Sequence, residues 1–223
     1  MTSVYLIRHA QAQGNLEQRF QGCTDTRLTP QGEKQVRFVA QRMRAIPLDA
    51  VYTSPLRRAW ETAQGIAKLH ELSPTVHEGL AEIDGGEMEN RPFEELERLY
   101  SEPFRQFIQE PHKFTGVGGG ESMQAVYQRM RDAVLELVRR HAGQCLAVVS
   151  HGAALRCFMC YASGLPLERM NELPWGDNTA VSHVTFNHQL EPLVHSLFDS
   201  SHLHIALLPV TPRFDSDKGQ VIK

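Results

Sequence analysis

Two short apolar runs, each leading to a histidine, most constrain how this chain can fold. Residues 4–7 read Val-Tyr-Leu-Ile and continue into Arg8 and His9, while residues 146–149 read Leu-Ala-Val-Val and lead to His151. Continuous apolar runs of this length are typical of strands covered on both faces, as in a parallel sheet. Ligands of open α/β sheets bind beyond the carboxyl ends of the strands. The pattern therefore predicts two imidazoles and an arginine at one sheet edge, which suits nucleophilic chemistry on a phosphate.

The segments between these runs alternate between helical and strand patterns. Thr29 and Pro30 have the composition of an N-cap and first helical position, and apolar residues then recur with helical spacing. Residues 50–53 predict a second strand, and Ser54 with Pro55 repeats the cap-and-proline pattern for a second helix. This order implies parallel strands joined by right-handed crossovers. We expect an α/β protein, a three-layer α/β/α sandwich around a mostly parallel central sheet.

Residues 84–120 interrupt the alternation with prolines, aromatic residues and three consecutive glycines. Because the segment is too short for a core of its own, we expect a helical, lid-like insertion over the active-site edge of the sheet. A long amphipathic helix is expected after Ser122, and two antiparallel strands are expected at residues 181–186 and 193–198.

The composition fits one domain with a large core, since 41% of the 223 residues are hydrophobic. We predict a single domain over residues 1–208 and a flexible C-terminal tail over residues 209–223. Cys157 and Cys160 have the spacing of a redox or zinc motif. No second pair matches them, so they are expected to be buried, reduced thiols on one helix face.

Charge and hydropathy narrow the range of partners. The formal net charge is −3 and no dense Lys/Arg cluster occurs, which argues against nucleic acid or an anionic membrane as the main partner. No apolar run approaches the roughly 20 residues that span a bilayer, and no secretory signal pattern precedes the first strand. We expect a cytoplasmic protein that is a monomer or a homodimer.

Chemistry on a phosphate requires a nucleophile, positive donors for the oxygens and an acid for the leaving group. The sequence contains no carboxylate cluster with metal-ligand spacing, so we expect no metal ion and no cofactor. Arginines can supply the positive charge, because the planar guanidinium binds two phosphate oxygens at once and stays charged.

A series of sequence blocks resembles the histidine phosphatase superfamily, specifically its phosphoglycerate mutase-like branch 1. The blocks are Leu-Ile-Arg-His-Ala-Gln at residues 6–11, Arg-Phe-Gln-Gly at 19–22, Leu-Thr-Pro-Gln-Gly at 28–32, Ser-Pro-Leu-Arg-Arg-Ala at 54–59, Leu-Ala-Glu-Ile-Asp at 80–84, Gly-Gly-Glu-Ser at 119–122, Ser-His-Gly at 150–152 and Asp-Asn-Thr at 177–179. They occur in family order and cover most of the chain, so the series is far more specific than any one block.

The resemblance implies a role for each matching residue. His9 is implied as the nucleophile that becomes phosphohistidine, and Glu82 as the proton donor to the leaving alkoxide. Arg8, Arg58 and His151 are implied as the rest of the catalytic phosphate pocket. The implied phosphate- and substrate-binding residues are Asn15, Gln21, Gly22, Gly152 and Asn178.

Two of these assignments have neighbours that compete for the role. Arg57 adjoins Arg58, and the family pattern Ser-Pro-Leu-x-Arg-Ala selects Arg58. Glu82 is followed closely by Asp84 and by further glutamates. The alternative interpretation is that Glu82 is an ordinary surface carboxylate with no role in the reaction.

The chain departs from the family pattern mainly after the acid block. Ala10 stands where the family usually has glycine, and Met88 and Asn90 replace the tryptophan and glycine of a common element. We predict that residues 84–120 set substrate choice, with Met88 as a flexible pocket residue that accepts varied ligand shapes.

Three functions remain open. The short, aromatic insertion favours a metal-independent phosphatase that acts on a small phosphorylated metabolite through phosphohistidine. A cofactor-dependent phosphoglycerate mutase is the alternative, and a non-catalytic phosphoester- or protein-binding relative is a minor one. Phosphoserine, phosphoglycerate, sugar phosphates and ribazole phosphate are all possible substrates.

Overall fold

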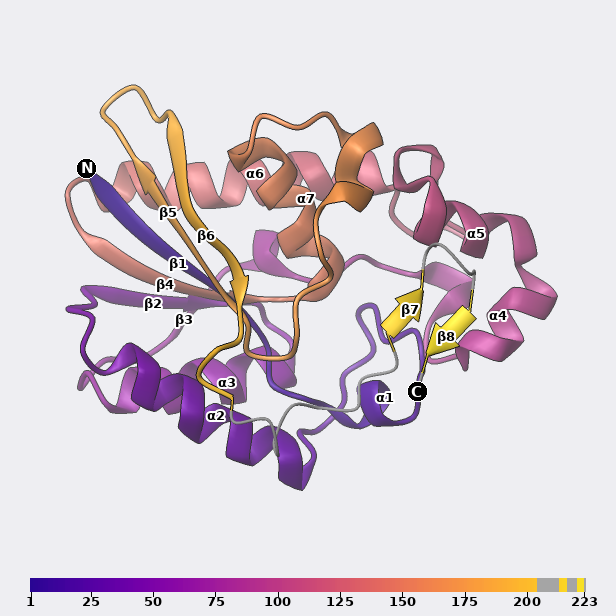
Figure 1. Ribbon diagram of the computed structural model, residues 1–223, viewed down its shortest axis with the longest axis horizontal. Coiled ribbons are helices and arrows are strands. Elements are labelled where there is room, and N and C mark those ends of the chain that lie inside the picture. The colour runs from indigo at the N-terminus through magenta and orange to yellow at the C-terminus, as the bar shows by residue number, and fades with distance from the viewer. Residues whose placement is uncertain (204–212, 216–219, 223) are drawn as a thin grey trace.

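A six-stranded sheet in the order β3-β2-β4-β1-β5-β6 forms the middle layer of the fold (Figure 1). The computed structural model describes residues 1–203 and the backbone of 213–215 and 220–222. The strands are β1 (Thr2–Arg8), β2 (Ala50–Thr53), β3 (Thr75–Val76), β4 (Cys145–Ser150), β5 (Val181–Phe186) and β6 (Pro192–Asp199). The first four pair in parallel, and β5 and β6 are antiparallel, as predicted.

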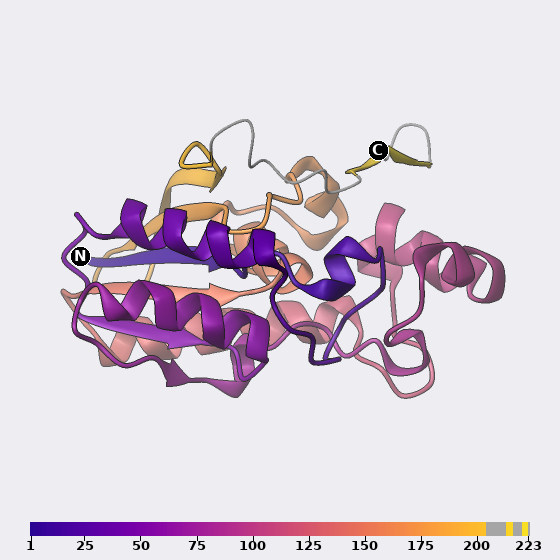
Figure 2. The ribbon, with the colours of Figure 1, turned by 90° about the horizontal axis from the view of Figure 1, so that it is seen from below.

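Helices cover both faces of the sheet. Figure 2 shows α2 (Pro30–Met43) and α3 (Arg57–Lys68) side by side across one face, where their apolar residues bury Ile7 and Val149 of the sheet. The other face packs against α6 (Met123–Arg140) and α7 (Gly152–Ala162) in a larger core. The predicted three-layer α/β/α sandwich with a mostly parallel sheet is confirmed.

Two of the three predicted helix starts are confirmed. The Thr29 side chain accepts a hydrogen bond from the N–H of Gly32 and caps α2, and Ser122 caps α6 in the same way. The predicted start at Ser54 is wrong, because α3 begins at Arg57 with Leu56 as its N-cap. The Ser54 hydroxyl instead accepts from the N–H of Leu56 and lies against a buried histidine.

The insertion at residues 84–120 lies beyond the carboxyl ends of the parallel strands (Figure 1). It contains η2 (Gly86–Met88), α4 (Phe93–Leu99), α5 (Ser101–Gln109) and η3 (Pro111–Lys113). The remaining short helices are α1 (Gln13–Leu16), η1 (Glu78–Leu80) and η4 (Leu167–Glu172). The insertion therefore has the predicted position, and its role as a lid stays a prediction.

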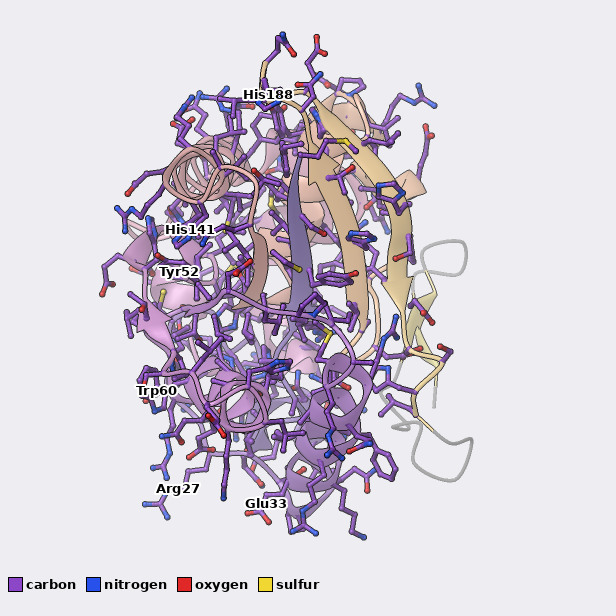
Figure 3. The ribbon with its side chains drawn as sticks, turned by 90° about the vertical axis from the view of Figure 1, so that its left-hand side faces the viewer. Arg27, Glu33, Tyr52, Trp60, His141 and His188 are labelled. Carbon is purple, nitrogen blue, oxygen red and sulfur yellow. The ribbon has the colours of Figure 1, made fainter. Side chains whose placement is uncertain are left out.

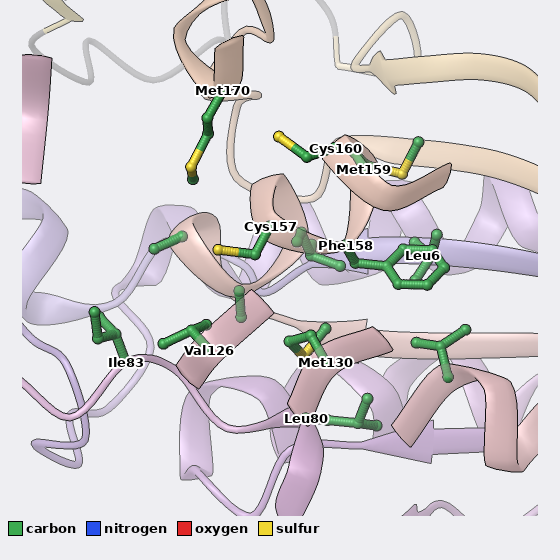
Figure 4. Packing of buried hydrophobic residues seen from close by; sticks show 14 of the residues in the cluster. Leu6, Leu80, Ile83, Val126, Met130, Cys157, Phe158, Met159, Cys160 and Met170 are labelled. Carbon is green, nitrogen blue, oxygen red and sulfur yellow. The ribbon is translucent and has the colours of Figure 1, made fainter. Parts of the chain in front are cut away.

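Most of the predicted tail lies outside the described residues. Within it the structure describes β7 (Arg213–Asp215) and β8 (Gln220–Ile222), which pair antiparallel, and the predicted boundary after residue 208 is not tested. Cys157 and Cys160 are buried free thiols in the core (Figure 4), as predicted. In the described part of the chain, no helix has the length and apolarity needed to cross a bilayer.

Candidate active site

The parallel pairing of β1 with β4 brings the two strand-end histidines together. Arg8 is the register partner of Ser150, so His9 and His151 both follow directly from paired positions. The backbone N–H of His9 donates to the carbonyl of Ser150 at 2.9 Å, and the two imidazole centroids lie 5.0 Å apart. The structure thus places both rings side by side at the carboxyl edge of the sheet.

The His9 ring is held in a single tautomer. Its Nδ1 lies 2.7 Å from the carbonyl oxygen of Ala10, and because a carbonyl only accepts, Nδ1 carries the proton. Burial lowers the pKa of His9 well below its ordinary value, and the charges of Arg58 and Arg8 lower it further. The ring is therefore neutral, with a free lone pair on Nε2.

Hydrogen bonds from two sides hold the backbone at His9 and Ala10. The N–H of Ala10 donates to Oγ1 of Thr62 at 3.0 Å, and that hydroxyl donates to the carbonyl of Arg58 at 2.7 Å. On the other side, Nδ2 of Asn178 donates to the carbonyl of His9 at 3.0 Å. These bonds stabilise the turn that aims the imidazole.

His151 is fully buried next to His9. Its Nε2 lies 2.7 Å from Oγ of Ser54, and its Nδ1 is buried with no hydrogen-bond partner in the part of the chain that the structure describes. Burial lowers the pKa of His151 well below its ordinary value, with Arg58 as the next contributor. A second neutral imidazole with one unused ring nitrogen therefore adjoins the first.

Two buried guanidinium groups supply the positive charge of the site. Nη1 of Arg8 donates to the carbonyl of Gly176 at 2.6 Å, and Arg58 donates to the carbonyls of Thr24 and Gly22 at 2.8 and 2.6 Å. Within the described part of the chain, the Nε of each arginine is buried without a hydrogen-bond partner. Burial lowers the pKa of both groups, and the charge of Glu82 opposes that shift.

The Glu82 carboxylate occupies the N-terminus of α7. Oε2 accepts from the N–H of Ala153 at 3.1 Å, while Oε1 accepts from Ala154 and from Ile83, both at 3.0 Å. Its competitor Asp84 is exposed and accepts from the N–H of Gly86. Of these two carboxylates, only Glu82 lines the cavity beside the arginines.

A cavity of about 570 Å³ opens over these groups. Among the residues predicted from the sequence, its lining includes Arg8, His9, Asn15, Gln21, Gly22, Arg58, Glu82 and Gly152. His151 and Asn178 are fully buried and are not among its lining residues: the His151 ring adjoins the His9 ring, and Asn178 donates to the carbonyl of His9. Asn178 therefore holds the His9 backbone, and its role in binding substrate stays a prediction.

Comparison with known proteins agrees with this geometry. Residues 4–198 match the model of the histidine phosphatase superfamily (branch 1). The chain belongs to this superfamily. The family suggested by the ordered sequence blocks is thus confirmed.

Similar proteins carry both phosphatase and mutase names. The chain is 36% identical to phosphoserine phosphatase 1 of Hydrogenobacter thermophilus over 76% of its own length and 80% of that protein. It is also 36% identical to the probable phosphoglycerate mutase GpmB of Klebsiella pneumoniae, over 74% and 77% of the two chains. The solved structure of Bacillus stearothermophilus YhfR matches with a TM-score of 0.87 and 31% identity, over 91% of this chain and 99% of YhfR.

The superfamily's Gly-Gly-Glu-Ser block has a structural role here that the sequence did not reveal. Glu121 forms an ion pair with Arg129 at 2.7 Å and also accepts from the N–H of Asp84. The Arg129 guanidinium then donates to the carbonyls of residues 79, 81 and 82. This ion pair fixes the backbone that carries Glu82. The sequence did not reveal this role, because the pattern around Arg129 predicts only a helix.

One departure from the superfamily pattern, Met88, lies deeper in the protein than predicted. The prediction that Met88 is a pocket residue is wrong, because its side chain is fully buried in the main core and does not line the cavity. Phe93 and Phe107 of the insertion do line it, together with Phe20 and Trp175 from elsewhere in the chain. In residues 1–203, no group of three or more His, Cys, Asp or Glu side chains is placed to hold a metal ion.

Proposed function

We propose that this protein hydrolyses a small phosphomonoester through a phosphohistidine on His9, with arginines and no metal ion supplying the positive charge. The observation that carries the proposal is the bond from Nδ1 of His9 to the carbonyl of Ala10, which leaves Nε2 as an unprotonated nucleophile. Superfamily relatives named as phosphatases support the same reaction class.

Three buried nitrogens around His9 support an anionic ligand. Among residues 1–203, the Nε atoms of Arg8 and Arg58 and the Nδ1 of His151 all lack hydrogen-bond partners. An unpaired buried polar group costs about 1–3 kcal/mol. A phosphoryl group has three non-bridging oxygens that can accept from them. We assign these three groups to the phosphate oxygens, where they stabilise the charge that develops during transfer.

Glu82 is assigned as the acid and base. In the first step, Nε2 of His9 bonds to phosphorus, the ester P–O bond breaks, and protonated Glu82 gives its proton to the leaving alkoxide. In the second step, ionised Glu82 takes a proton from water as that water attacks phosphorus. The P–N bond then breaks, phosphate leaves, and His9 and Glu82 return to their starting states.

A mutase is the second candidate, because a relative with that name is also 36% identical to the chain. It would use a second hydroxyl of the substrate in place of water. Three aromatic residues of the cavity lining, Phe20, Phe93 and Phe107, support the phosphatase, since phenyl rings offer no polar partner for a phosphoglycerate carboxylate. Release of inorganic phosphate distinguishes the two reactions.

The test is a labelling experiment with and without chelator. Rapid-quench samples with a labelled aryl phosphate should contain acid-labile, base-stable phosphate on the protein, and His9→Ala should contain none. His188→Ala, at an exposed turn far from the site (labelled in Figure 3), is the matched control. Loss of all turnover in chelator, restored by magnesium, would contradict the proposal.

We further propose a cytoplasmic location and a monomer or homodimer that binds a small phosphorylated metabolite. All four cysteines are free, which suits a reducing compartment. Light scattering after gel filtration measures the oligomeric state.

A further inference from the structure

One wall of the cavity is aromatic and is built from segments far apart in the chain. Phe20, Phe93, Phe107, Ile108 and Trp175 all line it. The centroids of Phe20 and Phe107 lie 5.0 Å apart, and those of Phe107 and Trp175 lie 6.1 Å apart. Phe20, Phe107 and Trp175 therefore form one row of neighbouring rings along this wall.

Trp175 connects this surface to the phosphate end of the cavity. A Cβ built on Gly152 would lie 3.7 Å from Cε3 of Trp175 and equally close to Cζ of Arg8. The indole thus adjoins both the first residue of α7 and a guanidinium assigned to phosphate. A group attached to a phosphate bound by Arg8 would therefore lie near this ring.

A buried cation fixes the indole from behind. Cζ of Arg156 lies 4.1 Å from the centroid of the Trp175 ring, a distance typical of a cation–π contact. Arg156 is 1% exposed, donates to the carbonyls of Met170 and Leu173, and forms no ion pair among residues 1–203. Burial lowers its pKa to about 10.

This arrangement leaves a defined part of the indole for a ligand. Because Arg156 covers one face of the ring, only the other face and the edges of Trp175 can contact a molecule in the cavity. A charge buried without a carboxylate partner is costly unless other contacts stabilise it. The ring and the carbonyls supply those contacts, so Arg156 and Trp175 constrain each other.

We propose that this aromatic wall is the subsite for the alcohol part of the substrate, and that the preferred substrate is the phosphate ester of an arylalkyl alcohol. The inference rests on the proposed function and adds the chemical class of the leaving group. Aromatic rings in such a pocket pack in offset or edge-to-face geometry, which favours a flat apolar ligand over an amino or sugar acid.

The kinetic test compares 2-phenylethyl phosphate, ethyl phosphate and phosphoserine. Their alcohols differ little in leaving ability, so a difference in kcat/KM reports binding of the alcohol part. We expect 2-phenylethyl phosphate to exceed the other two by at least about tenfold, or about 1.4 kcal/mol. Phosphoserine as the best substrate would overturn the proposal and point to Arg19 and Asp177, which also line the cavity.

Variants of Trp175 test whether this ring causes the preference for the phenylethyl ester. Trp175→Leu should reduce the ratio of the phenylethyl to the ethyl ester to about threefold or less, and Trp175→Phe should restore most of it. Trp60→Leu is the matched control, since Trp60 lies outside the cavity lining on the outer side of α3 (Figure 3). An unchanged ratio in Trp175→Leu would overturn the assignment of the subsite.

A binding measurement separates this inference from the proposed reaction. Trp60→Phe leaves Trp175 as the only tryptophan, because the chain has two, so indole fluorescence reports the subsite without turnover. We expect 2-phenylethyl phosphonate to bind at least about tenfold more tightly than ethyl phosphonate. Equal affinities for the two phosphonates would refute the subsite even if the phosphate esters are hydrolysed. Tighter binding of 2-phenylethyl phosphonate, together with no release of phosphate from the esters, would refute only the reaction.

Discussion

The Oγ of Ser54 lies 2.7 Å from Nε2 of His151 and also accepts a hydrogen bond from the backbone N–H of Leu56. Among residues 1–203, His151 Nε2 is the one acceptor within hydrogen-bond distance of the Ser54 hydroxyl, so the hydroxyl donates its proton to His151. A neutral His151 that accepts at Nε2 carries its proton on Nδ1, the buried nitrogen without a partner. Ser54 thereby makes His151 a donor toward the phosphate site.

Replacing Ser54 by Ala should release this constraint on the tautomer. We expect kcat/KM to fall by about tenfold or more. In part of the protein population, His151 would then lack the Nδ1 proton that it donates toward the transition state. Long-range 1H–15N NMR should show mixed His151 tautomers in Ser54→Ala and a single Nδ1–H tautomer in the wild type and in Ser54→Thr. A single tautomer in all three proteins would contradict this role.

Glu82→Gln should slow esters with poor leaving groups more than activated ones. An alkyl alkoxide needs a proton as it leaves, so ethyl phosphate hydrolysis should fall by about 100-fold or more. An aryl phosphate such as p-nitrophenyl phosphate needs little protonation and should be affected far less in its first step. Asp84→Asn is the control, since that exposed carboxylate only accepts from the N–H of Gly86.

Arg129 is expected to act through Glu82 and not on substrate. Its guanidinium binds the carbonyls of Gly79, Ala81 and Glu82 at 3.1, 2.7 and 2.9 Å. Arg129→Met should therefore lower kcat for ethyl phosphate more than for p-nitrophenyl phosphate while changing KM little, with partial rescue in Arg129→Lys. An equal loss on both esters would indicate general destabilisation of the fold.

The two buried histidines make stability depend on pH. The pKa values of His9 and His151 in the folded protein lie well below their ordinary value, while an unfolded histidine titrates near 6.5. Above about pH 6.5 neither state binds the proton, so stability is unaffected. Below about pH 6.5, only the unfolded chain binds the proton. The free energy of unfolding should therefore fall by up to about 1.4 kcal/mol per pH unit for each histidine as the pH is lowered.

Urea denaturation at pH 7.5, 6.5 and 5.5 measures this slope. His9→Gln removes one of the two groups and should reduce the slope by about one proton. A slope below pH 6.5 that is the same in both proteins would show that His9 is protonated in the folded state.

The sequence predicted the parts of the site that depend on strand order. His9 and His151 follow apolar runs, and parallel pairing in register brings such positions together at one edge. The role of Ser54 was not predictable, because Ser-Pro before a helix has the same composition whether the hydroxyl caps the helix or binds a buried ring. The contacts of Arg129 depend on how α6 packs against residues 79–82, which helical periodicity does not encode.

Met88 shows that prediction from sequence has a similar limit for residues of the core. A methionine at a position where relatives commonly have tryptophan suggested a flexible pocket residue, but the structure buries it completely in the main core. Sequence patterns indicate that such a residue is apolar, and they do not distinguish a cavity wall from the interior behind it.

Met88→Trp should therefore act on stability and not on substrate choice. A larger ring in a fully packed site forces neighbours apart, and such overpacking typically costs about 1–3 kcal/mol. We expect a lower Tm and equal losses of activity on 2-phenylethyl and ethyl phosphate, with Met88→Leu close to wild type because it conserves volume. A changed ratio of the two esters at unchanged Tm would instead mean that position 88 reaches the cavity in solution, and that the insertion sets specificity through its core as well as through Phe93 and Phe107.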